Sequence, residues 1–275
     1  MGFGCNAAGV TGCRIIDSPR ERLIAILTNS FVPCNGRFPT LIALITLFLA
    51  GAGALSGLLG GAILVAVIVL GVFMTLLSSR LLSHTVLKGV PSSFTLELPP
   101  YRPPQVGKVI VRSVLDRTLK VLGRAVVSAA PAGLLIWVLA NVSVGNATLL
   151  SHFTGFLDPL GRAMGMDGVI LAGFLLALPA NEIVMPIILM AYTAGTGLME
   201  LEGAALLGVL TANGWTWTTA VSVLLFTLMH WPCATTLMTI HKETKSAKWT
   251  LLGFLLPTVC GVAACLVFTA LMRLF

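Results

Sequence analysis

The sequence predicts an all-α, polytopic integral membrane protein. Of its 275 residues, 57% are hydrophobic and 10% are charged, whereas a soluble domain carries about 25% charged residues. The apolar residues form runs long enough for membrane-spanning helices, which need about 20 residues. Prolines interrupt some of these runs, and this predicts broken or re-entrant helices. We expect one transmembrane domain over residues 1–275, with about six to seven helical segments.

The first 40 residues combine a helix start with a helix break. Asp17 or Ser18 is a candidate N-cap, and Pro19 suits the first helical position. This helix is expected to end at the run Pro33-Cys-Asn-Gly36. The arginines of this segment indicate a surface on the cytoplasmic side: Arg14, Arg20, Arg22 and Arg37.

Apolar and basic segments then alternate along the chain. Residues 41–82 predict a helical hairpin that returns to the basic side. Residues 83–121 predict a cytoplasmic loop followed by an amphipathic helix at the membrane interface, because basic residues alternate there with Val, Ile and Leu. A further crossing is expected to end near Asn141, and residues 143–167 are expected to be a short polar connection on the far side.

The apolar stretch over residues 168–240 contains no Lys or Arg. One of its pieces, residues 201–213, is too short to cross a bilayer with about 20 residues. We therefore interpret the stretch as one or three crossings with broken or re-entrant pieces. Lys242, Lys245 and Lys248 return the chain to the cytoplasm, and residues 249–272 predict a terminal helix.

Glu182 lies in the middle of this apolar stretch, bracketed by Pro179 and Pro186. Each proline removes a backbone donor and disfavours a continuous helix. A carboxylate at membrane depth beside a helix break is a candidate functional site, since transporters use such breaks to hold ions. The alternative is a kinked helix in which Glu182 faces a loop.

The sequence contains a short internal echo. Residues 32–40 and residues 231–239 align with Pro-Cys in register and a shared final Thr. A polar break lies upstream of each: Gly4-Cys-Asn6 before the first, and Ala180-Asn-Glu182 before the second. Repeats that meet at a site in the midplane of the membrane are typical of transporters.

The polar residues of these breaks suit a transition metal. A set of thiolate, imidazole and carboxylate favours a first-row divalent ion such as Fe²⁺ and does not suit the all-oxygen sites of Mg²⁺ or Ca²⁺. Because a free Cys is often simply buried, a packing role for each cysteine remains open, and His230 beside Trp231 could be an interfacial residue. The candidate ligands are Cys5, Cys34, Cys233, Glu182, His230, Asn181 and Met185.

Several other classes of function are disfavoured. The balance of 17 Lys and Arg against 10 Asp and Glu is explained by positively charged cytoplasmic loops, and we expect no nucleic acid partner. The chain lacks HExxH, GxSxG and the phosphate loop GxxxxGK[ST]. We therefore expect no enzymatic activity and no bound cofactor.

Several motifs resemble the bacterial ferrous iron transport protein B family. They are Gly2-Phe-Gly-Cys-Asn6, Arg20–Thr28, Pro33-Cys34, Arg37-Phe-Pro39, Glu97–Arg102, Pro232-Cys-Ala-Thr235 and Lys242–Trp249, in the family's order. The resemblance implies a multi-pass Fe²⁺ importer of the bacterial inner membrane. It also implies that Cys5, Cys34 and Cys233 are gate cysteines and that Glu182 is the glutamate of the second gate. On this basis residues 1–40 are part of a first gate element and residues 168–240 are a second.

The chain departs from the family pattern in three respects. It has no G domain, it begins inside the first gate motif, and Asn181 and His230 replace residues more usual in the family. We therefore expect a fragment, one half of a split transporter or a relative without a G domain. The implied partners are the lipid bilayer, a GTPase domain or subunit acting in trans, and a complementary half-transporter or a second copy.

Two functions remain open on the sequence. In the first, Fe²⁺ passes through a cavity between the two gate elements and is bound transiently by their ligands. In the second, the chain is a non-transporting gate-type membrane module or scaffold of the nucleoside-recognition kind. The sequence does not separate Fe²⁺ from Mn²⁺, Zn²⁺ or Co²⁺, because the preferred ligands of these ions overlap.

Overall fold

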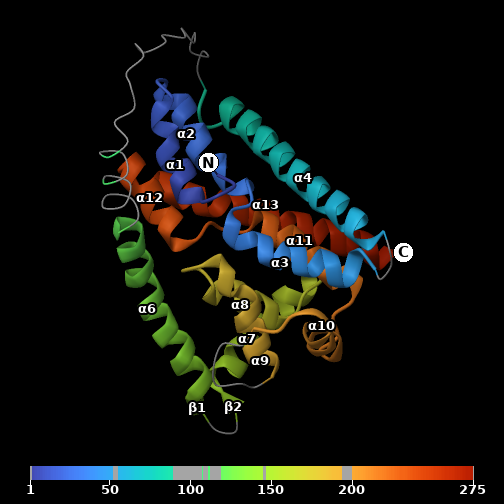
Figure 1. Cartoon of the computed structure of the whole chain (residues 1–275). Coiled ribbons are helices and arrows are strands. Elements are labelled where there is room, and N and C mark those ends of the chain that lie inside the picture. Colours follow the sequence, from blue (N-terminus) through green and yellow to red (C-terminus); the bar gives the residue numbers. More distant parts are fainter. Residues whose placement is uncertain are drawn as a thin grey trace.

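The computed structural model is almost entirely helical and is shown in Figure 1. The residues that it describes are 2–51, 55–88, 107, 111, 119–144, 147–193 and 200–274. The predicted interfacial helix and the loop before it fall mostly outside these ranges. Within them, the prediction of an all-α fold with broken helices is confirmed.

The N-terminal part contains two short helices, a break and a long helix. In order, the elements are α1 (Asn6–Gly12), η1 (Cys13–Ile15), α2 (Pro19–Thr28), η2 (Asn29–Phe31), η3 (Asn35–Arg37), α3 (Phe38–Leu44), the π-helical turn η4 (Ile45–Leu49) and α4 (Ser56–His84). Helix α2 begins as predicted: the Ser18 side chain accepts a hydrogen bond from the Glu21 backbone N–H, and Pro19 occupies the first turn.

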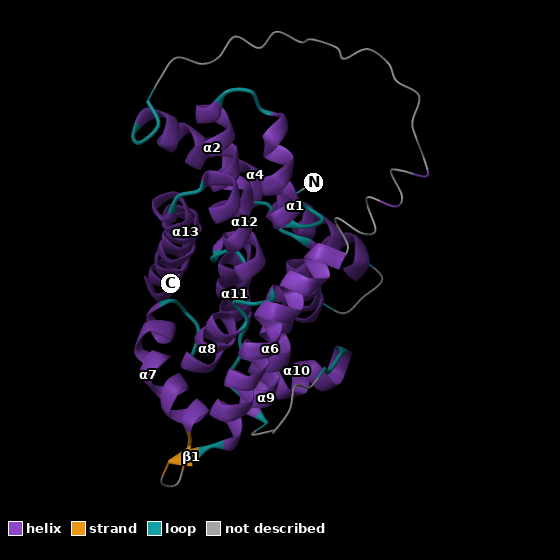
Figure 2. Ribbon diagram, turned by 90° about the vertical axis from the view of Figure 1, so that its left-hand side faces the viewer, coloured by secondary structure: helices purple, strands orange, loops and turns teal. Residues whose placement is uncertain are grey.

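The C-terminal part has a similar broken character. Its elements are α6 (Lys120–Asn141), β1 (Ser143–Val144), β2 (Ala147–Thr148), α7 (Leu149–Ala163), α8 (Gly168–Leu176), η6 (Asn181–Ile183), α9 (Val184–Tyr192), α10 (Gly203–Ala212), α11 (Trp217–Met229), α12 (Ala234–Thr244) and α13 (Ala247–Leu274). The two strands pair as a small antiparallel hairpin (Figure 2).

The prediction of a polar connection over residues 143–167 is wrong. This segment holds the helix α7, and α7 and α8 meet at an angle of 110°. Two glycines allow the close approach: a Cβ on Gly161 would lie 2.5 Å from the Asp167 carbonyl oxygen, and one on Gly168 would lie 2.0 Å from the Thr154 carbonyl oxygen. The sequence did not predict helix α7 because its polar residues, which lie on one face of an amphipathic helix, and Pro159 suggested a loop.

The helices are arranged from one end of the molecule to the other. In Figure 1, α1, α2 and α12 lie at one end, α7 to α10 lie at the other, and α3 and α11 lie between them. Helix α1 packs on α12, α3 packs on α11, and α13 packs on α11 and α12. Helix α2 precedes its break while α12 follows its own, so the two crossings α2–α3 and α11–α12 run in opposite directions.

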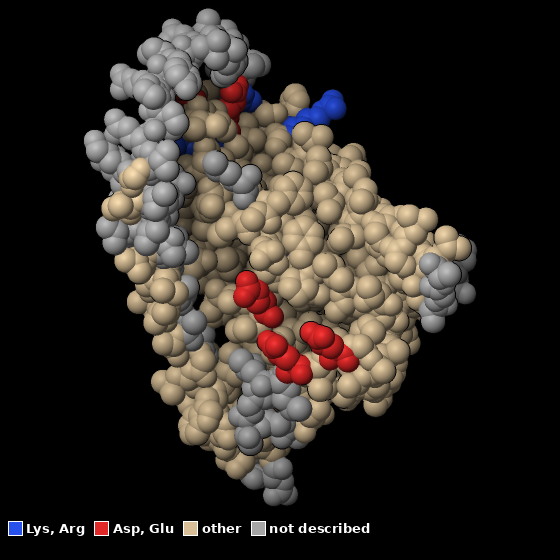
Figure 3. All heavy atoms as spheres, in the orientation of Figure 1, with Lys and Arg blue, Asp and Glu red and all other residues tan. Residues whose placement is uncertain are grey.

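The helices are long and apolar enough for a multi-pass membrane protein. In the part of the chain that the structure describes, four segments meet the length and composition of a membrane span, or up to five if the bent pair α7–α8 counts as one. Helix α4 exposes apolar side chains over most of its 29 residues, as expected for a surface that faces lipid. The Lys and Arg atoms visible in Figure 3 lie at the end of the molecule that holds α2, which matches a cytoplasmic side there.

The helices that lead to the two breaks, α2 and α12, each have about half the length needed to cross a bilayer. Helix α2 has 10 residues and α12 has 11, and at 1.5 Å per residue both are about 15 Å long. This length is half of a hydrocarbon core of about 30 Å. The largest apolar core is built mainly from α8, α9, α10 and α11. It lies on the side of the breaks that faces away from α2 and α12.

Candidate metal site at the helix breaks

The two Pro-Cys breaks have the same local structure. Cys34 is extended (φ −84°, ψ 168°), and so is Cys233 (φ −61°, ψ 159°), and each residue is the N-cap of the helical turn that follows. The backbone N–H of the next residue pairs each break with a distant one: Asn35 donates to the Gly4 carbonyl at 3.2 Å, and Ala234 donates to the Leu178 carbonyl at 2.8 Å. The two donors, Asn35 and Ala234, occupy equivalent positions when the two Pro-Cys segments are aligned.

The upstream breaks match in the same way. Cys5 (φ −151°, ψ 125°) and Ala180 (φ −149°, ψ 118°) are both extended N-caps. Each precedes a buried asparagine, Asn6 in the first break and Asn181 in the second. Four breaks therefore form two similar pairs, one pair in each half of the chain.

Arg37 connects the two broken crossings. It was expected at the cytoplasmic surface, but its side chain is fully buried. Its guanidinium donates to the carbonyl oxygen of Ser30 in its own crossing, and to those of Leu228, His230 and Trp231 in the other. The expectation was wrong because a basic residue marks a membrane surface only if the folded chain offers its side chain no buried hydrogen-bond acceptors. The sequence alone does not show such acceptors.

Asn181 lies between two other predicted ligands. Its Nδ2 is 4.0 Å from Cys34 Sγ, and its Oδ1 is 3.4 Å from His230 Nε2. His230 Nδ1 lies 3.0 Å from the carbonyl oxygens of both Phe226 and Thr227. Both ring nitrogens thus face acceptor oxygens, and a neutral ring carries only one proton, so it can donate either from Nδ1 to these carbonyls or from Nε2 to Asn181 Oδ1. The ring nitrogen that carries no proton is the one that a metal could bind.

Glu182 packs against the first Pro-Cys break. A Cβ added to Gly36 would lie 2.9 Å from Glu182 Cγ and 3.3 Å from Glu182 Oε1. The turn η3, which contains Gly36, and the turn η6, which contains Glu182, are in contact. The Glu182 side chain itself is exposed. Glycine at position 36 thus makes room for this carboxylate beside Cys34.

The remaining predicted ligands are less closely grouped. Cys233 is half-buried, and its sulfur lies 3.0 Å from Thr235 Oγ1 and 3.2 Å from Thr236 Oγ1. Cys5 is exposed, and Met185 is buried in the apolar core with α8 and α9. Among the residues that the structure describes, no three His, Cys, Asp or Glu side chains are close enough to hold a metal together.

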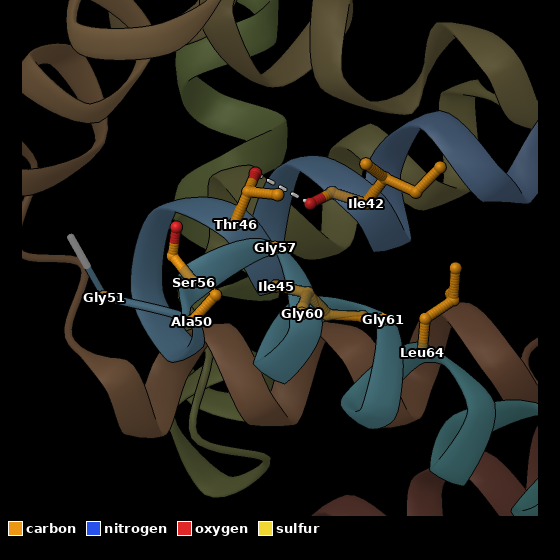
Figure 4. Close-up of a pocket in the computed structure, with 10 residues that line it drawn as sticks. All are labelled: Ile42, Ile45, Thr46, Ala50, Gly51, Ser56, Gly57, Gly60, Gly61 and Leu64. Atoms are coloured by element: carbon orange, nitrogen blue, oxygen red, sulfur yellow. Dashed lines mark hydrogen bonds between the residues drawn. The ribbon is translucent and has the colours of Figure 1, made fainter. Parts of the chain in front are cut away.

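Two grooves are lined by residues other than the predicted ligands. One, of about 320 Å³, lies between α3, η4 and the start of α4, and Figure 4 shows that small and apolar residues line it. The other, of about 350 Å³, lies between α2 and α4 and includes Thr28, Asn29, Thr75 and Ser79. Neither contains a predicted ligand.

The fold and the paired breaks define a polytopic α-helical membrane protein with intramembrane helix breaks. Two family models match this chain: "Ferrous iron transport protein B C terminus" over residues 64–116 and "Nucleoside recognition", the Gate family, over residues 122–247. The chain is homologous to the membrane part of the Fe(2+) transporter FeoB, in accord with the resemblance noted in its motifs.

Curated relatives support this assignment. The Fe(2+) transporter FeoB of Staphylococcus aureus (strain MSSA476) is 30% identical over 286 residues, which cover 100% of this chain and 40% of the relative. The Fe(2+) transporter FeoB of Methanocaldococcus jannaschii is 27% identical and covers 98% of this chain and 40% of the relative. The chain therefore spans less than half the length of these relatives. No solved structure matches it.

Proposed function

We propose that this chain forms the membrane pathway of a divalent metal transporter, with Fe²⁺ as the transported ion. The relatives named Fe(2+) transporter FeoB support this proposal. The observation that carries it in the structure is the placement of Asn181, which contacts both Cys34 of one crossing and His230 of the other. An ion bound there would touch both broken crossings at membrane depth.

The proposed gate elements are residues 1–40 and residues 168–240. Their antiparallel arrangement is the one used by transporters with inverted repeats, in which the substrate site lies at the interface of the repeats. We infer that the ion passes between them and exchanges ligands stepwise. Cys34, His230 and Asn181 are the central set, and Glu182, Cys233, Cys5 and Met185 supply further ligands as the elements move.

The chemistry of this set fits a borderline metal. Fe²⁺ and Zn²⁺ bind a thiolate and a neutral imidazole nitrogen more readily than Mg²⁺ and Ca²⁺ do. Metal binding requires the thiol to lose its proton, so binding releases protons and becomes stronger as the pH rises.

The length of the relatives supports a proposal about partners. This chain matches 40% of each full FeoB relative, and we propose that a GTPase domain or subunit acts with it. A complementary half-transporter or a second copy would complete the pathway on the lipid-exposed sides. The proposed location is the inner membrane of a bacterium, with the α2 end in the cytoplasm.

The second candidate function is a gate-type module that does not transport. The match to the Nucleoside recognition model favours it, and so does the wide spacing of His, Cys, Asp and Glu side chains within the described ranges. In that case the cysteines and Glu182 would be structural.

Anaerobic Fe²⁺ binding to purified protein separates the two functions. Wild type is compared with Cys34→Ser and Glu182→Gln, and Cys260→Ser serves as the control because it removes a half-buried thiol from α13 that is not among the predicted ligands. Saturable binding that is weakened by the first two changes and kept by the control supports transport. Absent binding, or binding indifferent to both changes, supports the non-transporting module.

A further inference from the structure

Arg37 is a buried cation without a carboxylate partner among the described residues. Its side chain has 0% exposure and lies at the break between α2 and α3. The ion pairs that the structure describes are Arg14 with Glu243 and Arg162 with Asp158. A charge buried at membrane depth is costly unless other groups compensate it, so its compensation must come from the backbone.

Four carbonyl oxygens surround the guanidinium. Nη1 lies 2.9 Å from the Ser30 oxygen and 3.0 Å from the Leu228 oxygen. Nη2 lies 3.1 Å from the His230 oxygen and 3.3 Å from the Trp231 oxygen. All four bonds use the two terminal nitrogens, and Nε has no partner in the described structure. The two terminal nitrogens of the guanidinium thus bind both crossings.

These carbonyls belong to the ends of two half-helices. Ser30 lies in the turn that follows α2, and Leu228 and His230 lie at the end of α11. The last carbonyls of a helix lack partners within it, and the helix dipole is negative at that end. Two such ends that point at one spot create a site for a cation, and unwound carbonyls at half-helix ends hold cations in transporters.

We propose that Arg37 is a tethered cation that fills a carbonyl cage shared by the two crossings and thereby excludes free cations from it. The cage would take a guanidinium-type ion, which offers two parallel donors, in preference to a neutral molecule of the same shape. The side chain also joins the antiparallel crossings, since three of its four acceptors lie in the crossing opposite its own. This inference does not depend on which metal is transported.

Chemical rescue tests the cage. Arg37→Ala is purified, and its Tm is measured in detergent with guanidinium or with urea, both far below denaturing concentrations. We expect the variant to lose thermal stability, guanidinium to restore most of the lost Tm in a saturable way, and urea to restore none. A Tm that responds equally to both compounds, or to neither, overturns the proposal.

A surface arginine provides the matched control. Arg22 also donates to backbone carbonyls, those of Ile16 and Asp17, but it is only half-buried. Because water can replace its bonds, Arg22→Ala should lose little Tm, and guanidinium should not raise it. A saturable rise in this control would show that guanidinium acts nonspecifically and would overturn the proposal.

A second pair of variants covers the case in which Arg37→Ala does not fold. Arg37→Lys keeps a positive charge at the end of a flexible stem but loses the fork, and Arg37→Met has a similar length and no charge. If the cage is a cation site, the Lys variant has the higher Tm of the two. A Met variant as stable as the Lys variant, or more stable, overturns the proposal, because an uncharged side chain would then suffice.

Discussion

His230 Nε2 lies 3.4 Å from Asn181 Oδ1, and the Nδ2 atom of the same amide lies 4.0 Å from Cys34 Sγ. An imidazole and a thiol from opposite crossings therefore share one buried amide. The two groups come from residues 34 and 230, which are far apart in the sequence, and Asn181 comes from a third break. In the proposed pathway, an ion at this amide would pass between the thiol of Cys34 and the imidazole of His230.

Replacing the ring of His230 should weaken Fe²⁺ binding. In His230→Phe the aromatic contacts with Phe174 and Phe226, whose ring centroids lie 5.0 Å and 5.8 Å away, can be kept while Nε2 is lost. We expect the affinity to fall by at least about 10- to 100-fold, because this is the loss seen when even the outer-shell partners of metal ligands are removed. His241→Phe changes an exposed histidine and is the control. Equal affinity in both variants would refute the role of His230.

Adding one methyl group at Gly36 should displace Glu182. The new Cβ of Gly36→Ala would meet Glu182 Cγ at 2.9 Å, and such overpacking costs about 1–3 kcal/mol. The expected results are a lower Tm and weaker Fe²⁺ binding. In Gly208→Ala the new Cβ meets nothing within 4 Å, so this control should bind Fe²⁺ normally. Normal binding by Gly36→Ala would remove Glu182 from the site.

The thiol of Cys13 should react slowly with maleimide. Burial raises its pKa, and the negative charge of Glu243 raises it further; its Sγ also lies 3.3 Å from the Gly9 carbonyl oxygen. A raised pKa leaves less thiolate at neutral pH, and the thiolate is the nucleophile. In variants with a single cysteine, Cys13 should label more slowly than the exposed Cys5, and its rate should rise with pH. Glu243→Gln should speed the labelling of Cys13, and an unchanged rate would contradict the effect of that charge.

The ion pair between Arg14 and Glu243 should contribute little to stability. Its atoms approach to 2.6 Å, and it joins the turn after α1 to α12, but the Arg14 side chain is 58% exposed. Exposed pairs contribute about 0.2–1 kcal/mol and are weakened by salt. A double-mutant cycle with Arg14→Ala and Glu243→Ala should give a coupling energy in this range that shrinks at high salt. A larger coupling that is insensitive to salt would show that the pair is shielded from water.

Gly168→Ala should destabilise the junction of α7 and α8. The added Cβ would overlap the Thr154 carbonyl oxygen at 2.0 Å, and because backbone cannot move aside cheaply, we expect a loss at or above about 3 kcal/mol. Gly155→Ala, in the middle of α7, meets nothing within 4 Å and should stabilise the helix by about 0.5–1 kcal/mol. Thermal unfolding compares them, and a shift of the same sign in both variants would contradict the packing described.

Proline made the breaks predictable. Pro33 and Pro232 precede the two extended cysteines, and Pro179 precedes the break at Ala180. A missing backbone donor is a local property, so the sequence shows it directly. Pro186 was expected to break a helix too, but it lies in the first turn of α9, where its missing N–H costs nothing.

The contacts between breaks could not be predicted in the same way. The burial of Arg37, the pairing of Asn181 with His230 and the space that Gly36 leaves for Glu182 all depend on which segments meet in three dimensions. Composition and periodicity describe one segment at a time and carry no such information. The bend between α7 and α8 was missed for a related reason. It depends on glycines that let backbone atoms of two segments approach closely, and this contact is visible only in the folded chain.

The depth of the breaks gives the proposed pathway an electrical property. If α2 and α12, with 10 and 11 residues, begin at the edge of the hydrocarbon layer, the breaks lie about halfway across it. A membrane potential changes the energy of one charge by about 2.3 kcal/mol per 100 mV for a full crossing. Two charges that cross half of the field change in energy by the same amount, about 2.3 kcal/mol per 100 mV. A negative interior would therefore lower the energy of a divalent ion by this amount as it moves from outside to the breaks.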